Sequence, residues 1–439
     1  MTWLQRYRIR HWLRNSIWIS PVIAMVMALV AVRLLIWIDV SMGWQANLNP
    51  ETTRAVIGSL AGAMFTFIVF VCSSLLLVVQ LASAQFTPRV IGNMFRDRVT
   101  KLTLAVFVFT FTFDLAALLR IDATVPFLVT QIAVYGCAVS VGAFLFMVDH
   151  VGKMLRPNGV FESIASQAHD VINSVYPRRL SDARESFVES ADIVSGLPSQ
   201  TVRSLKGGVL LAFDLPGLVS IAIRHDCVIE LLPQVGNFVA PGDPLFRIHG
   251  HADVPTDALH QSIALGGERT LEQDPAFAFR VIVDVASKGL SPAINDPTTA
   301  VLAIDRIHHL LRHVGGRCLD DERIRDKSGR VRLFYRTPDW TDFVSLAVTE
   351  IRQFGGTSIQ VARRLRAMLD DLIATLPEER AAALLQEQEK LKKSAQRFFQ
   401  EPEDRALANV SDSQGVGGAH EAGHARAEAA QAIARGEAK

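Results

Sequence analysis

Four long apolar stretches fill the first third of this 439-residue chain, and none of comparable length follows them. A helix rises ~1.5 Å per residue and the hydrocarbon core of a bilayer is ~30 Å thick, so each stretch is long enough to cross a membrane. The pattern predicts a transmembrane domain of four α-helices over residues 1–150. The stretches are Ile17–Ile38, Val56–Leu81, Leu102–Leu119 and Val125–Val148.

The chain after position 150 has the composition of a soluble protein and is long enough to bury a core of its own. The net charge of +1 provides no electrostatic basis for binding nucleic acid. The four cysteines, Cys72, Cys137, Cys227 and Cys318, are scattered without metal-ligand spacing, so we expect reduced thiols. No metal and no cofactor is predicted.

Basic residues alternate in abundance between the segments that flank the four stretches. This alternation follows the positive-inside rule and predicts that both termini are cytoplasmic. The alternative, a cleaved signal peptide over residues 1–40, requires a shorter apolar run and a small-residue cleavage motif. The basic residues are Arg6, Arg8, Arg10 and Arg14 in the tail, Arg54 in the first loop, Arg89, Arg96, Arg98 and Lys101 in the second, Arg120 in the third, and Lys153 and Arg156 after the last stretch.

Two opposite charges lie inside the predicted spans at similar depth. Arg33 and Asp114 both come roughly 8–9 Å below the outer end of their stretches, at ~1.5 Å per residue. Charges in hydrocarbon are costly, so we predict an ion pair between the first and third spans. The alternative is that Arg33 extends to the interface while Asp114 is protonated or hydrated.

The second span carries polar residues at every seventh position, which places them on one helical stripe. They are Ser59, Thr66, Ser73, Gln80 and Thr87. Such a stripe either lines water or packs against a neighbouring helix, and the nearby pair Gly58 and Gly62 favours close packing. The basic segment 82–98 that follows is a candidate for contact with anionic lipid headgroups.

The soluble part is expected to be α+β. Residues 151–206 are interpreted as a helical connector, and residues 207–255 as a small β-barrel or sandwich. Its strands are predicted over Gly208–Asp214, Leu218–His225 and Val228–Leu232, with a hairpin over 234–248. This hairpin resembles those of lipoyl-like modules, but no lysine occurs between Gly207 and Gly250, so covalent lipoyl or biotin carriage is not expected.

Residues 256–400 predict a mostly helical domain. Asp274-Pro275 and Asp296-Pro297 each combine an N-cap with a first-turn proline. The turn between these two helices carries Lys288, Ser291, Asn295 and Asp296. We interpret it either as a capped corner or as a site for an anion or a partner's backbone. A strand Val331–Arg336 and the helices Thr341–Phe354, Ser358–Thr375 and Glu378–Phe399 follow, and residues 401–439 are expected to be disordered.

No catalytic motif appears in the chain, so no catalytic residue is assigned and an enzyme is the minority hypothesis. It would require Lys288, Asn295 and Asp296 to converge in a pocket. His309 and His313 share a helix face near His308, but no carboxylate or cysteine stands at a complementary spacing, so surface histidines are preferred to a metal site.

Several short motifs together resemble a bacterial family of predicted membrane proteins catalogued as domain of unknown function 2254. They are Phe86–Val90, Phe95–Arg98, the run Ala286–Ala300 (ASKGLSPAINDPTTA), Arg352–Gly355, and Gln360–Val361 with Arg363–Leu365. The resemblance covers about residues 10–400. It implies a bacterial inner-membrane protein, and it implies no activity, cofactor or catalytic residue.

Two functional hypotheses remain open. The first is a homo-oligomeric channel or transport-type protein, in which the second span lines the path of an ion or small anionic ligand and the soluble domain regulates it. The second is a membrane-anchored sensor or scaffold, in which the soluble domain binds a small ligand or a protein partner.

Overall fold

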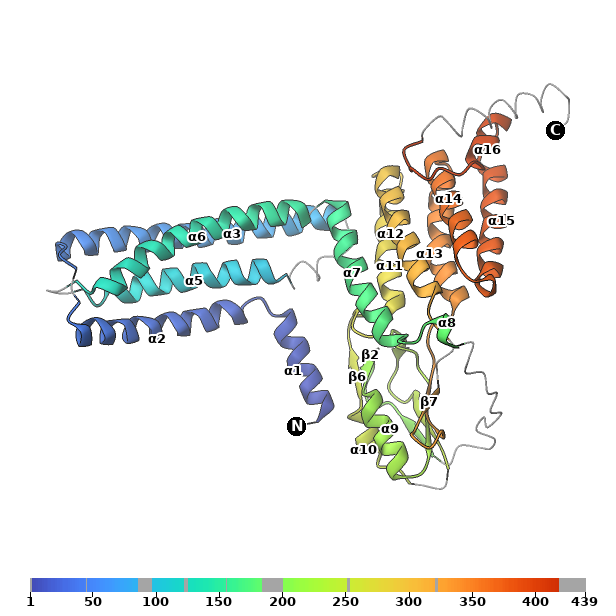
Figure 1. Cartoon of the computed structure of the whole chain (residues 1–439), viewed down its shortest axis with the longest axis horizontal. Helices are drawn as coiled ribbons and strands as arrows, with labels where there is room; N and C mark the ends of the chain where they lie inside the picture. The colour runs from blue at the N-terminus through green and yellow to red at the C-terminus, as the bar shows by residue number, and fades with distance from the viewer. Residues whose placement is uncertain are drawn as a thin grey trace. The chain divides into compact units, whose positions relative to one another are not determined.

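The computed structural model describes residues 2–44, 46–85, 97–121, 125–154, 156–183, 200–250, 253–319 and 323–417. The chain divides into two compact units, which are described separately: Ile9–Gly159, and Met1–Arg8 with Val160–Lys439. The first unit is helical and the second contains both helices and strands (Figure 1).

Four helices of the first unit are long and apolar enough to cross a membrane, which confirms the four predicted apolar helices as candidate spans. In Figure 1 they lie side by side, and α5 contacts each of the other three. Because α5 is the interior helix, its apolar side chains Phe107 and Phe113 are fully buried. The helices are α1 (Trp3–Asn15), α2 (Ile19–Met42), α3 (Pro50–Gln85), α5 (Arg98–Leu118) and α6 (Phe127–Met154).

The second unit contains two open sheets rather than a closed barrel. A five-stranded sheet has the order β1-β5-β3-β8-β7, in which only β3 and β8 run parallel, and a three-stranded sheet has the order β4-β2-β6. The strands are β1 (Gln200–Arg203), β2 (Gly208–Phe213), β3 (Val228–Leu231), β4 (Phe238–Val239), β5 (Pro244–His249), β6 (Ile263–Gly266), β7 (Arg323–Arg325) and β8 (Val331–Tyr335). The sheets therefore extend beyond the predicted β module of residues 207–255, because β1 precedes it and β6, β7 and β8 follow it.

The predicted strand Leu218–His225 is wrong, because these residues belong to helix α9 (Leu215–Arg224). The Asp214 side chain accepts the Gly217 N–H at 3.1 Å and so caps the helix. Leu218 and Ala222, one turn apart, are buried against the sheet core. A short apolar run does not distinguish strand from helix by periodicity, and the Asp-Leu-Pro-Gly sequence was compatible with a turn as well as with a cap.

Two of the remaining helices of this unit begin at the predicted aspartate–proline pairs. Asp274 and Asp296 accept the N–H groups of Phe277 and Thr299 at 3.0 and 3.1 Å, and each is followed by its proline. The helices are α7 (Pro157–Val175), α8 (Leu180–Ala183), α10 (Thr256–His260), α11 (Pro275–Gly289), α12 (Pro297–Gly315), α13 (Trp340–Phe354), α14 (Ile359–Thr375), the 3₁₀ turn η1 (Glu378–Arg380), α15 (Ala381–Phe398) and α16 (Pro402–Ala408).

The predicted disorder from position 401 is wrong for residues 401–417, and residues 418–439 lie outside the described ones. After α16 the chain packs along α14, where the N–H of Asp412 donates to the Arg363 carbonyl at 3.3 Å. The buried Asp412 carboxylate accepts the N–H groups of Gln414, Gly415 and Gly417. This segment has few apolar residues, so its composition resembled that of a disordered chain although side-chain and backbone hydrogen bonds hold it.

Candidate functional site

The polar stripe of α3 faces away from its own helical unit. Ser59, Thr66, Ser73 and Gln80 are all exposed, whereas Ile57, Ala61, Met64 and Val71 form the buried face of α3. The hydroxyls of Ser59 and Thr66 donate to carbonyls of their own helix, at 2.9 and 3.1 Å. Gly62 is open, because an added Cβ would meet nothing within 4 Å. Thr87 and most of the basic segment 82–98 lie outside the described residues.

Arg33 and Asp114 do not form the predicted ion pair. Arg33 is exposed on α2, whereas the Asp114 side chain on α5 is fully buried at 0% exposure. The Asp114 Oδ2 accepts a hydrogen bond from the Cys137 thiol on α6 at 3.3 Å. Depth along a span follows from residue counting, but the direction in which a side chain points depends on how the helix is rotated against its neighbours. Arg33 and Asp114 therefore lie at a similar depth along their helices, but their side chains point in different directions.

Asp114 belongs to a polar seam where α5 packs against α6. The hydroxyls of Thr110 and Ser140 lie 3.0 Å apart, and Ser140 also donates to the Gly136 carbonyl at 2.9 Å. Gly136 faces Thr110 directly, and an added Cβ would lie in ordinary van der Waals contact with the Thr110 methyl group at 3.4 Å. The seam, defined by Thr110, Asp114, Cys137 and Ser140, was not recognised from the sequence. The sequence did contain a signal for it. Thr110 and Asp114 are four residues apart on α5, and Cys137 and Ser140 are three residues apart on α6, so each pair lies on one face of its helix.

A second buried carboxylate in the first unit has a structural role. Both oxygens of Asp39 on α2 accept the N–H of Leu128 at the start of α6, at 3.1 and 3.0 Å. A carboxylate at a helix N-terminus satisfies an otherwise unpaired donor and interacts favourably with the helix dipole. Asp39 was also missed in the sequence, because it caps a helix distant in the chain.

The turn between α11 and α12 is a capped corner. The Asp296 carboxylate caps α12 and its N–H donates to the Gly289 carbonyl at 2.7 Å, while the Ser291 hydroxyl donates to the Lys288 carbonyl at 2.7 Å. Asn295 adopts the left-handed conformation at φ 48° and is exposed. The hydrogen bonds of Ser291 and Asp296 thus lie within the corner itself, which corresponds to the structural interpretation of this motif.

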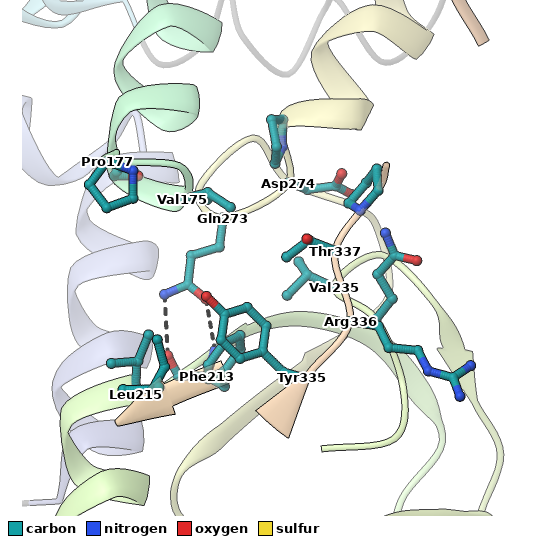
Figure 2. Close-up of a pocket in the computed structure, with 15 residues that line it drawn as sticks. Val175, Pro177, Phe213, Leu215, Val235, Gln273, Asp274, Tyr335, Arg336 and Thr337 are labelled. Atoms are coloured by element: carbon teal, nitrogen blue, oxygen red, sulfur yellow. Dashed lines mark hydrogen bonds between the residues drawn. The ribbon is translucent and has the colours of Figure 1, made fainter. Parts of the chain in front are cut away.

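A cavity of about 220 Å³ lies in the second unit at the end of α7, and its lining includes none of the four corner residues (Figure 2). The Gln273 amide spans one wall, accepting the Phe213 N–H at 3.0 Å and donating to the Phe213 carbonyl at 3.2 Å. Asp274 on the rim is buried, which raises the pKa of its carboxyl despite the opposing charge of Arg269. Figure 2 shows the Tyr335 ring beside Gln273 and the Arg336 guanidinium directed away from it.

The three candidate histidines of α12 have separate surroundings. His308 lies 2.7 Å from Asp371, His309 is exposed, and the His313 ring stacks on His169 of α7 with centroids 3.9 Å apart. Among the described residues, no group of three or more histidine, cysteine or acidic side chains is arranged to hold a metal. His308 and His313 therefore serve contacts between helices, and His309 is a surface residue.

The His313 stack predicts acid sensitivity of the α7–α12 contact. Burial and the neighbouring His169 lower the pKa of His313 from 6.5 to about 4. Between these values the unfolded chain binds a proton that the folded chain does not, so stability is present above pH 6.5 and falls as the pH is lowered. We expect a loss of ~1 kcal/mol near pH 5 after allowing for solvent screening. Thermal unfolding at several pH values tests this: His313→Gln should flatten the profile, and His309→Gln should change it far less, because His309 is a smaller contributor to the lowered pKa of His313 than burial and His169.

The comparisons with known proteins agree with the membrane character of the chain. The model of a family described as "Predicted membrane protein (DUF2254)" matches residues 14–371. The uncharacterized protein Mb1321c of Mycobacterium bovis is 25% identical over 435 residues, covering 92% of this chain and 80% of that protein. The uncharacterized protein Rv1290c of Mycobacterium tuberculosis gives the same identity and coverage. No solved structure matches. Because the family match spans most of the chain and confirms the resemblance seen in its motifs, the chain belongs to the DUF2254 family of predicted membrane proteins.

Proposed function

We propose that this protein is a homo-oligomeric channel or transport-type protein of the bacterial inner membrane, with both termini in the cytoplasm and a regulatory soluble unit. The observation that supports this best is the outward direction of the polar stripe on α3. Its four described members are exposed in the single chain although they lie within a candidate span. The alternation of basic residues supports the orientation.

A polar stripe that faces lipid is unfavourable, because hydrocarbon offers its side chains no partners. The hydroxyls of Ser59 and Thr66 are bonded within α3, but Ser73 and Gln80 extend the stripe further along the same face. A second copy of α3 would cover this face, and Gly62 would permit close approach of the two backbones. Around a central axis the same stripes would line a path for an ion or small anionic ligand.

Reconstitution in liposomes tests this function. We expect cation or anion flux from the wild-type protein and a particle mass of several chains in detergent. Ser73→Leu and Gln80→Leu should reduce flux at least tenfold, because they make the stripe apolar. Cys72→Leu is the matched control, since Cys72 is an exposed neighbour of Ser73 outside the stripe. Absence of flux under every ionic gradient, or equal flux from all four proteins, would remove the proposal.

The cavity beside Gln273 favours a second candidate, a membrane-anchored sensor. It is lined by the end of α7, by residues of β2, β7 and β8, and by the start of α11, and all of these residues belong to the second unit. A thermal-shift screen of the full-length protein with a metabolite library tests this, because a ligand that binds only the folded state stabilises it. The sensor hypothesis requires a stabilising ligand whose effect is lost in Tyr335→Ala. A ligand with unchanged effect in that variant binds elsewhere.

A further inference from the structure

The carboxyl of Asp114 is a buried acidic group with few polar partners in the first unit. It is 0% exposed and lies within a candidate span. Oδ2 accepts a hydrogen bond from Cys137, whereas Oδ1 is buried without a hydrogen-bond partner among the described residues. No ion pair involving Asp114 occurs in the described part of the chain. On α2, the helix that also packs against α5, Arg33 is exposed and Asp39 is occupied as the cap of α6.

A charged carboxylate in this position is expensive, because burial removes water and only one weak donor replaces it. Adding a proton to the carboxyl removes the charge. Asp39 is an informative contrast within the same unit, since it is 2% exposed but both of its oxygens accept a backbone N–H at a helix N-terminus. Asp39 therefore has a backbone donor at a helix N-terminus, and no such donor reaches Asp114 among the described residues.

Further polar groups lie between α5 and α6 on the way from Asp114 to the N-terminal end of α5. The Thr110 and Ser140 hydroxyls lie one turn away on the two helices. At the end of the seam, the Asp97 carboxylate lies 3.2 Å from the His150 ring. The buried side chains of Phe107 and Met147 separate these two polar levels. Polar groups therefore occur at two levels along α5, with an apolar layer between them.

We propose that Asp114 is a proton-binding site within the membrane. The carboxylate takes up one proton to become the neutral acid and releases the same proton when the charge is restored. Cys137 is a positioning residue, because its thiol donates to Oδ2, which shares the negative charge of the deprotonated form. The inference deepens the proposed transport function by naming the proton as the ion handled at this seam, and it rests on that function only for the flux measurement below.

Carbodiimide labelling tests proton binding without reference to transport. Dicyclohexylcarbodiimide adds to a protonated carboxylic acid in apolar surroundings and yields a stable N-acylurea, which peptide mass spectrometry locates. In full-length wild-type protein in liposomes, we expect labelling at Asp114 and none at Asp39. Labelling at Asp114 should decline at least tenfold as the pH is raised from about 5 to about 9. Absence of label at Asp114, or equal labelling of both aspartates at every pH, would overturn the inference.

Variants of Cys137 test the positioning role. Cys137→Ala removes the donor to the charged form, so the pH of half-maximal labelling should rise by about one pH unit. Cys137→Ser retains a donor and should stay close to wild type. Cys72→Ala, at an exposed thiol on α3, is the control. An identical midpoint in all four proteins would show that the thiol does not position Asp114.

Flux measurements distinguish this inference from the proposed function. Proton uptake driven by a membrane potential in liposomes should fall at least tenfold in Asp114→Asn. If Asp114 is labelled but no ion is transported, the proton site stands and the transport function fails. If other ions are transported and Asp114 is not labelled, the function stands and the proton site fails.

Discussion

Replacing Gly236 with alanine is expected to destabilise the second unit by ~3–5 kcal/mol. Gly236 has φ +92°, a conformation in which an L side chain costs ~1–2 kcal/mol. An added Cβ would also collide with the Arg269 guanidinium and lie 2.5 Å from Oδ2 of Asp274. These two groups form an ion pair at 2.7 Å in which Asp274 is 3% exposed. Disturbing the buried Asp274 carboxylate, which also caps α11, adds ~2–3 kcal/mol, even though Arg269 itself is partly exposed to solvent.

Gly242→Ala is the matched control, because Gly242 has φ +91° but nothing within 4 Å of an added Cβ. It should cost only the ~1–2 kcal/mol of the backbone conformation. The measurement is the temperature at which the buried thiol of Cys227 becomes reactive in the full-length protein. We expect Gly236→Ala to lower this temperature by roughly 10 °C, about two to three times the effect of the control. Equal shifts for the two variants would mean that the ion pair adjusts without cost.

Truncating Phe343 is expected to cost ~3–5 kcal/mol, the range for a fully buried aromatic residue replaced by alanine. Its ring on α13 is 0% exposed and lies 5.2 Å from the Phe279 ring of α11 and 6.2 Å from the Tyr176 ring. Tyr176 follows α7 and its hydroxyl donates to the Pro338 carbonyl at 3.1 Å. Phe343→Ala therefore opens a cavity where α7 joins the helices of the second unit.

Phe343→Leu is the control for volume, and it should retain most of the stability because it fills much of the cavity. Thermal reactivity of the buried Cys318 thiol, which lies near α7 in the fold, provides the measurement. We expect a far larger decrease for alanine than for leucine. A small effect of both would show that the neighbouring rings collapse into the space, which is the known reason why such costs vary between sites.

Local chemistry made several elements predictable. The four spans follow from length and hydropathy, and the starts of α11 and α12 follow from an aspartate cap beside a proline, because these signals act within one turn of the chain. The pairing of strands was harder to predict from the sequence. The β3–β8 pair joins Ile229 to Leu333, residues so far apart that no local pattern links them. The same limit explains the error at Leu218–His225, where burial against the sheet core accompanies the helical conformation.

The amino-acid sequence by itself determined that this protein has four helices long and apolar enough to cross a membrane and a separate α+β region, because hydropathy and helix capping are properties of contiguous residues. Only the tertiary structure decided which way each span is rotated. Ser73 and Gln80 face outward, Arg33 is exposed, and Asp114 is buried against Cys137. All four were visible as polar residues in apolar runs. Their directions depend on packing between helices that are distant in the chain, and a single helix carries no record of which face its neighbours will cover.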